Sequence, residues 1–217
     1  MKKNLNVKKL RKLQELIQEK IQLRRLRSIV EYVGGCDVSY RGKIAVGCIV
    51  VMNSEFKIIE VSCYSGKVDF PYIPTFLSFR ELPFLYRAFR KLTVKPTVLL
   101  VDGQGIAHPR GIGLASHMGL LTKKPTIGVA KNPLVGSFEL PEPTKGSFRY
   151  IYSESGEVIG AVLRTRASVK PVYVSPGHLI DLLSSIEIVM KYTTKYRLPE
   201  PLRMAHIYSK KEFRNAA

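Results

Sequence analysis

Apolar residues gather in short runs along the chain, and the polar residues between these runs predict a mixed sheet. Three strand-like runs follow one another at 32–40, 43–52 and 57–66. The connections between them, "RG" and "NSEF", are too short for a crossover, so we predict an antiparallel meander. Next, an apolar strand at 97–101, a helix at 109–121 and a strand at 126–130 form a β-α-β unit, whose two strands should run parallel.

Apolar residues at helical spacing predict further helices over 4–27, 77–92, 177–192 and 199–213. The second of these could begin at Pro83 instead, because proline fits the first position of a helix. The third would start behind a Ser175-Pro176 cap. Additional strands are predicted at 148–153, 157–165 and 171–175. We therefore expect one α/β domain over residues 1–217, with a three-strand antiparallel meander joined to parallel strands and helices on both faces of the mixed sheet.

The charge balance indicates a polyanionic partner. The chain has 35 Lys and Arg against 17 Asp and Glu, which gives a net charge of +18. Such an excess attracts nucleic acid above all, although solubility or a ribosomal type of protein is an alternative explanation. The basic helix over 4–27 could be a packing helix with a solvated outer face or an arm that contacts phosphates.

The sequence also argues against a membrane protein and against a zinc site. No apolar run reaches the roughly 18 residues of a membrane span, and the lysine-rich start lacks the apolar core of a signal peptide. The three cysteines, Cys36, Cys48 and Cys63, form no C-x-x-C pair. We expect buried, reduced thiols and a cytoplasmic location.

Two aspartates stand where a buried strand would not normally place a charge. Asp102 directly follows the strand at 97–101, and Asp37 lies inside the strand at 32–40. If these strands are neighbours, the two carboxylates repel each other, and a divalent cation between them would relieve the repulsion. Oxygen ligands without a thiolate favour Mg²⁺ or Mn²⁺ over zinc. A plain turn at Asp102 and a core aspartate at position 37, satisfied by main-chain amides, is the alternative that spacing leaves open.

Five blocks of sequence resemble the endonuclease V family. "VDGQGIAHPRGIGLASHMG" (101–119) resembles the family's V-D-G-x-G-x-x-H-P-R block, and "PYIPTFLSFRE" (71–81) its P-Y-I-P…F-R-E block. The other three blocks are "GGCDVSY" (34–40), "GVAK" (128–131) and "RMAHIYS" (203–209). The resemblance runs from about residue 5 to 210 with the blocks in order, and the five blocks together are highly specific. The resemblance implies a ribonuclease H-like fold, which agrees with the predicted sheet.

The resemblance also implies a catalytic centre. Asp37, Glu81 and Asp102 would be the carboxylate cluster that holds Mg²⁺, for which Mn²⁺ can substitute; His206 would lie nearby, and Lys131 would lie at the reacting phosphate. Hydrolysis of a phosphodiester needs an activated water and neutralisation of charge on the phosphate and the leaving oxygen, which Mg²⁺ can supply. The lysine would add positive charge where negative charge develops.

Substrate recognition follows from the same blocks. Tyr72 would be a wedge that stacks in place of an extruded base, on a loop stiffened by two prolines; a tyrosine packed under that loop is the alternative. Glycines in the 101–119 block would let main-chain amides approach the base or a phosphate. His108 would lie at the substrate, or would instead cap the helix predicted from Pro109. The implied substrate-binding residues are Pro71, Tyr72, Ile73, Pro74, Gly103, Gly105, His108, Gly113 and Ala130.

The function implied is that of a DNA repair endonuclease. It would nick the strand at the second phosphodiester bond 3′ to deoxyinosine and leave the lesion in place, acting as a monomer on DNA with deaminated bases, with inosine RNA as a further partner and no membrane. One alternative is an inosine-specific ribonuclease or another ribonuclease H-like nuclease. A basic nucleic-acid-binding protein without catalysis is the other, since charge alone does not indicate an enzyme.

Overall fold

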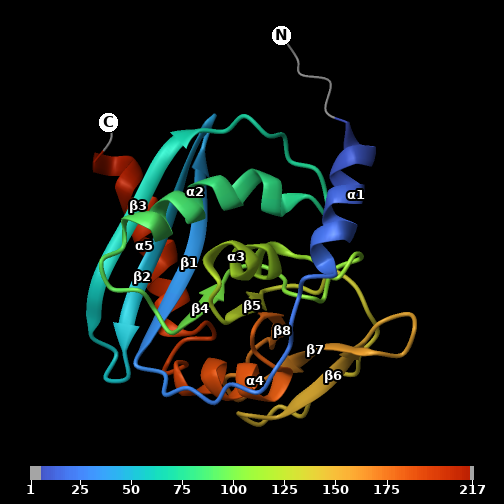
Figure 1. Ribbon diagram of the computed structural model, residues 1–217. Helices are drawn as coiled ribbons and strands as arrows, with labels where there is room; N and C mark the ends of the chain where they lie inside the picture. Colours follow the sequence, from blue (N-terminus) through green and yellow to red (C-terminus); the bar gives the residue numbers. More distant parts are fainter. Residues whose placement is uncertain (1–5, 216–217) are drawn as a thin grey trace.

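The computed structural model describes residues 6–215, which are built on one eight-stranded mixed sheet of order β3-β2-β1-β4-β5-β8-β7-β6 (Figure 1). The strands are β1 (Tyr32–Arg41), β2 (Ile44–Asn53), β3 (Ile58–Lys67), β4 (Val98–Val101), β5 (Thr126–Ala130), β6 (Phe148–Tyr152), β7 (Val158–Leu163) and β8 (Val172–His178). β1 pairs antiparallel with β2 and parallel with β4, which in turn runs parallel to β5. The predicted meander and β-α-β unit are therefore confirmed.

Helices cover both faces of this sheet, because neighbouring strand residues point to opposite sides. Ile49 and Val51 of β2 pack in one core with α2 (Leu77–Lys91) and α3 (Leu114–Thr122). Val50 and Met52 pack on the other side, against α5 (Glu200–Asn215); α4 (Leu182–Lys191) covers the same side further along the sheet. Figure 1 shows α2 in front of the meander and α5 behind it. The predicted α/β class with helices on both faces is confirmed.

Two helices begin later than predicted. The helix expected from 109 starts at Leu114, with Gly113 at its N-cap, because residues 109–113 form a loop in which the Gly113 amide donates to the Gly105 carbonyl. The helix expected from 177 starts at Leu182, where the side chain of Asp181 accepts a hydrogen bond from the Ser184 amide at 2.8 Å. The Ser175-Pro176 pair instead continues β8, which is paired with β5.

Two other helix limits also differ from the prediction. α1 (Val7–Gln18) ends well before residue 27, and the following segment instead runs beside β8 and α4, where the Gln22 and Leu26 amides donate to His178 and Ser184. Residues 4 and 5 of the predicted helix lie outside the described residues. α2 runs through Pro83 from Leu77, so the alternative start at the proline is wrong.

The expectation of three reduced cysteines is wrong. Cys48 of β2 and Cys63 of β3 stand directly opposite each other in the antiparallel register and are joined by a disulfide, with Cα atoms 4.1 Å apart. Cys36 is a free thiol in the core. Within residues 6–215, no helix has the length and apolar character needed to cross a membrane.

Candidate active site

Three carboxylates from separate parts of the chain meet at the carboxyl end of β4. Cys36 pairs with Val101 in the parallel register, so the next residue on each strand, Asp37 and Asp102, lie side by side. The Asp102 amide donates to the Cys36 carbonyl at 3.1 Å. Glu81, on the second turn of α2, is close enough to both aspartates to feel their charge. The structure thus brings together the three predicted carboxylates.

Burial and mutual repulsion change the acidity of this cluster. Glu81 is 9% exposed, and burial raises its pKa to about 8, with the nearby charges of Asp37 and Asp102 adding to the rise. The Tyr40 hydroxyl donates to Glu81 Oε1 at 3.1 Å and opposes that rise. Burial also raises the pKa of Asp102, against the opposing charge of Lys131. The cluster is short of positive charge.

Side chains, and not main-chain amides, satisfy Asp37. Its Oδ2 accepts from Ser209 Oγ at 2.7 Å and from His206 Nδ1 at 3.2 Å, both on α5. Ser39 Oγ lies 2.6 Å from Ser209 Oγ, which leaves Ser39 to donate to that hydroxyl. His206 was predicted near the cluster, and the two serines were not. The signal for Ser209 was its spacing, since a residue three positions after His206 lies on the same face of a helix.

Lys131 supplies the positive charge beside the cluster. It directly follows β5, the strand next to β4, and its Nζ forms an ion pair with Asp102 Oδ2. Its side chain is 43% exposed, so the ammonium group is open to a ligand in solvent. The ends of two adjacent parallel strands therefore place a carboxylate and an ammonium in contact, as expected at the carboxyl edge of such a sheet.

The donor chemistry of the cluster fits a divalent cation. Asp37, Glu81 and Asp102 offer carboxylate oxygens only, and oxygen ligands suit Mg²⁺ or Mn²⁺. The raised pKa values of Glu81 and Asp102 show that another positive charge there would be stabilising. Over the described range 6–215, no three His, Cys, Asp or Glu side chains form a ready-made ligand set. An ion would therefore have to draw these carboxylates together.

A cavity of about 390 Å³ opens beside the carboxylates. Asp102, Lys131 and Tyr72 all line it; the further lining includes Pro74, Thr75, Gly103, Gln104, His108 and Gly113. Tyr72 is 68% exposed, so it is not packed under its proline loop. Of the other predicted residues, Pro71 and Ile73 flank Tyr72, and Ala130 is the buried end of β5; these three do not line the cavity.

Two glycines of the 101–119 block do not offer their amides to a ligand, contrary to the prediction. The Gly105 amide donates to Ser175 Oγ at 2.7 Å, and the Gly113 amide donates to the Gly105 carbonyl at 2.9 Å. A Cβ at Gly105 would lie 2.0 Å from the Pro176 carbonyl oxygen, so close packing explains this glycine. Gly103 differs, because its amide has no acceptor among residues 6–215 and it lines the cavity.

His108 is held by the protein through both ring nitrogens. Its Nε2 donates to the Thr75 carbonyl at 2.9 Å, and its Nδ1 accepts from the Arg110 amide at 3.2 Å. Burial lowers its pKa to about 4, so the ring is neutral at pH 7. It does not cap a helix, since α3 begins six residues later. It lines the cavity with a ring that has no nitrogen left for a phosphate.

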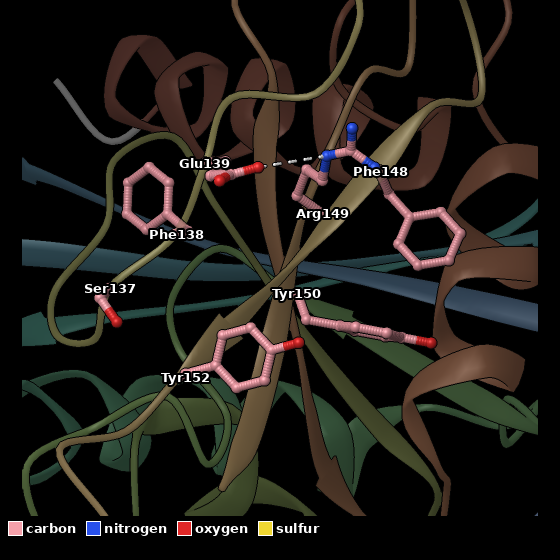
Figure 2. Close-up of a pocket in the computed structure, with 7 residues that line it drawn as sticks. All are labelled: Ser137, Phe138, Glu139, Phe148, Arg149, Tyr150 and Tyr152. Carbon is pink, nitrogen blue, oxygen red and sulfur yellow. Dashed lines mark ion pairs between the residues drawn. The ribbon is translucent and has the colours of Figure 1, made fainter. Parts of the chain in front are cut away.

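A larger cavity lies away from the carboxylates. Figure 2 shows a concavity of about 700 Å³ at the edge strand β6, lined by Phe138, Phe148, Tyr150 and Tyr152, with Arg149 and Glu139 above them. The nitrogen Nε of Arg149 lies 3.8 Å from Glu139 Oε2, on the surface. None of the predicted site residues lines it. Size alone would have pointed to the wrong place.

Comparisons with known proteins agree with this geometry. The family profile described as Endonuclease V matches residues 13–207. A protein of Dictyoglomus turgidum called Endonuclease V is 51% identical over 201 residues, which cover 92% of this chain and 88% of that protein.

Solved structures extend the likeness to the fold. The crystal structure of Endonuclease V from Bacillus subtilis has a TM-score of 0.92 at 32% identity, covering 100% of this chain and 97% of that one. Endonuclease V of Ciona intestinalis, solved with a 24mer DNA containing an inosine followed by a ribo-adenosine, has a TM-score of 0.85 at 33% identity, covering 97% and 99%. The ribonuclease H-like fold is thereby confirmed. The profile match, the sequence identity and the likeness of fold lead to one conclusion: the chain belongs to the endonuclease V family.

Proposed function

We propose that this protein is a DNA repair endonuclease that nicks a strand near deoxyinosine by divalent-metal-assisted hydrolysis of a phosphodiester. The observation that carries the proposal is the buried cluster of Asp37, Glu81 and Asp102, which lies beside a cavity with an exposed tyrosine. A binding protein without catalysis would gain nothing from buried, repelling carboxylates under a basic surface. The Ciona relative solved with inosine-containing DNA supports the choice of lesion.

The metal would be held by the three carboxylates. Nucleases of this family generally depend on divalent metal ions, and we propose Mg²⁺, with Mn²⁺ able to replace it. The ion would supply charge neutralisation and an activated water. Within the chain, His206 and Ser209 orient Asp37 by hydrogen bonds. Lys131 would place its ammonium where the phosphate gains negative charge.

The cavity would receive the base next to the scissile strand. Tyr72 would stack where that base leaves the duplex, and the unstacking it requires costs least at a mispaired or deaminated base. Gly103 lines the cavity and its amide has no acceptor within residues 6–215, so this amide would donate to an acceptor group on the base edge. The proline loop would hold the tyrosine ready and so reduce the entropy lost on binding.

The finer features of this function rest on the sequence blocks. They are cleavage at the second phosphodiester bond 3′ to deoxyinosine, with the lesion left in place. We further propose a single domain over residues 1–217, action as a monomer and a cytoplasmic location; the location no longer rests on reduced cysteines, because Cys48 and Cys63 are joined by a disulfide. Cleavage of inosine-containing RNA is the second candidate function. The specific observation in its favour is the ribo-adenosine that follows the inosine in the DNA bound by the Ciona relative.

A nicking assay on duplexes with one inosine tests the proposal. Wild-type protein with Mg²⁺ should cut the inosine strand and leave the matched adenine duplex intact. Asp102→Asn, which removes a charge and keeps the shape, should lower the rate by at least about 100-fold, because it removes a group acting on charge in the transition state. A parallel assay on RNA with one inosine distinguishes the DNA endonuclease from the inosine-specific ribonuclease. A cut by Asp102→Asn at the wild-type rate would contradict the mechanism.

A further inference from the structure

One main-chain carbonyl in the tyrosine loop is bound by three separate donors. The Thr75 carbonyl accepts from Gln14 Nε2 at 3.0 Å, from His108 Nε2 at 2.9 Å and from Arg110 Nη2 at 2.9 Å. Arg110 Nη2 also donates to Thr75 Oγ1 at 2.6 Å. Thr75 thus ties the loop both to helix α1 and to the segment that follows β4.

Thr75 has a backbone conformation that needs such support. The Phe76 amide donates to the Ile73 carbonyl at 3.0 Å, which closes a turn with Pro74 second and Thr75 third. Thr75 has a φ of +68°, in the region that glycine usually fills at this turn position. A β-branched residue there is held only when its surroundings fix it. The three donors that bind the Thr75 carbonyl fix the residue in this conformation.

Gln14 is the unusual member of this group. Its side chain is completely buried, whereas Leu13 and Leu16 of the same helix are 43% and 51% exposed. Both ends of its amide are used, because Nε2 donates to Thr75 and Oε1 accepts from Arg110 Nε at 2.7 Å. The guanidinium carbon of Arg110 in turn lies 4.6 Å from the centre of the Phe76 ring. The buried contribution of α1 to this region is therefore a polar one.

We propose that Gln14 is a positioning residue that fixes Thr75 through this network, and thereby sets where Tyr72 meets the substrate. The inference rests on the proposed function, in which Tyr72 engages the lesion. Tyr72 stands three residues before Thr75, and both line the cavity that holds Asp102. Gln14 itself does not line that cavity, so it acts through the loop. Lesion binding should depend on it, and the chemical step should not.

The first test measures the loop without any substrate. Hydrogen exchange of the full chain should increase in residues 69–76 of Gln14→Leu and stay unchanged in Leu13→Ala, the matched control on the exposed side of α1. Gln14→Glu keeps the acceptor for Arg110 but loses the donor to Thr75, so it should show an intermediate increase. Unchanged exchange in the loop would overturn the proposal. An increase spread over the sheet would also overturn it, by assigning Gln14 to general stability.

The second test measures the substrate. Gln14→Leu should bind an inosine duplex about tenfold more weakly, the effect of one lost hydrogen bond to a constrained group. Its affinity for the unmodified duplex and its cleavage rate at saturating enzyme should stay within about twofold of wild type. In a Tyr72→Ala background the loss should vanish, because the two residues act as one unit. If Gln14→Leu still weakened binding about tenfold in the Tyr72→Ala background, the proposal would be overturned. If wild-type protein fails to cut inosine DNA, the proposed function fails, and the exchange experiment still decides the role of Gln14.

Discussion

At the scale of single residues, the site contains buried carboxylates, whose ionised form destabilises the folded protein. Burial makes the ionised form of Glu81 costly, and its pKa of about 8 lies well above the usual value of about 4.3. Functional sites concentrate such shifts because the same burial that costs stability strengthens electrostatic interactions with a bound ion. The stability of the protein should therefore carry a pH signature of its active site.

Replacement of Glu81 by glutamine should reveal that signature. A pKa raised by folding gives stability that is complete below the unfolded pKa and is lost as pH rises through about 8. Without divalent ions, the free energy of unfolding of wild type should fall by roughly 2–3 kcal/mol between about pH 6 and pH 9 through this group. Glu81→Gln should lack that loss. Thermal unfolding at both pH values measures the free energy of unfolding of each protein. If wild type and Glu81→Gln lost the same stability between these pH values, the prediction would be contradicted.

Tyr72 should act in recognition and not in chemistry. Tyr72 lines the cavity and is 68% exposed, so the core does not depend on its ring. Tyr72→Ala should weaken binding to an inosine duplex by roughly 10-fold or more, the value of about one lost stacking contact, while metal affinity and melting temperature change little. Tyr72→Phe, which keeps the ring, is the control and should bind almost as wild type does. Fluorescence titrations with duplex and with Mn²⁺ give both affinities.

At the scale of elements, the site depends on how tightly the β4–α3 loop packs against β8. Gly105 hydrogen-bonds Ser175 and leaves no space for a side chain, since a Cβ would meet the Pro176 carbonyl at 2.0 Å. This contact fixes the loop that begins with Asp102 and Gly103. The Asp102 carboxylate is thus placed by the end of β4 and by the main-chain packing of the loop that follows it.

Gly105→Ala should accordingly destabilise the protein. Overpacking of a tight contact costs about 1–3 kcal/mol, so the melting temperature should fall by several degrees. Gly66→Ala in β3 is a suitable control, because the nearest atom to its added Cβ, in Tyr64, would be at 3.4 Å, an ordinary contact. Its melting temperature should stay near that of wild type. If both substitutions cost the same, the packing argument for Gly105 is wrong.

At the scale of the whole molecule, the net charge of +18 should strengthen binding to any DNA duplex. It should not determine the preference for an inosine duplex over an unmodified one. Each phosphate neutralised contributes about −0.9 to the slope of log K against log salt, so binding to any duplex should weaken steeply from about 50 to about 200 mM salt. The ratio of affinities for inosine and unmodified duplexes should stay constant within about twofold, because base contacts carry it. Anisotropy titrations at several salt concentrations measure both quantities, and a ratio that falls with salt would contradict this division.

The sequence by itself determined the strand pattern of the sheet and the residues of the candidate site. The alternation of short apolar runs predicted the meander and the parallel pair, since period and connection length are local properties of the chain. Once β1 and β4 are neighbours, Asp37 and Asp102 must be adjacent, and this could be inferred before any coordinates. The sequence blocks around Glu81, Lys131 and His206 placed the remaining candidates.

Only the tertiary structure decided features that depend on distant partners. Pairing with β5 kept Ser175 and Pro176 in a strand, although the local sequence suits a helix start. The antiparallel register set Cys48 opposite Cys63. Ser175 occupied the amide of Gly105, and Gln14 reached Thr75 across 61 positions of the chain. A local pattern predicts which element a residue joins, but the partner of its polar groups is chosen by packing between elements, and that choice fixed the working geometry of the site.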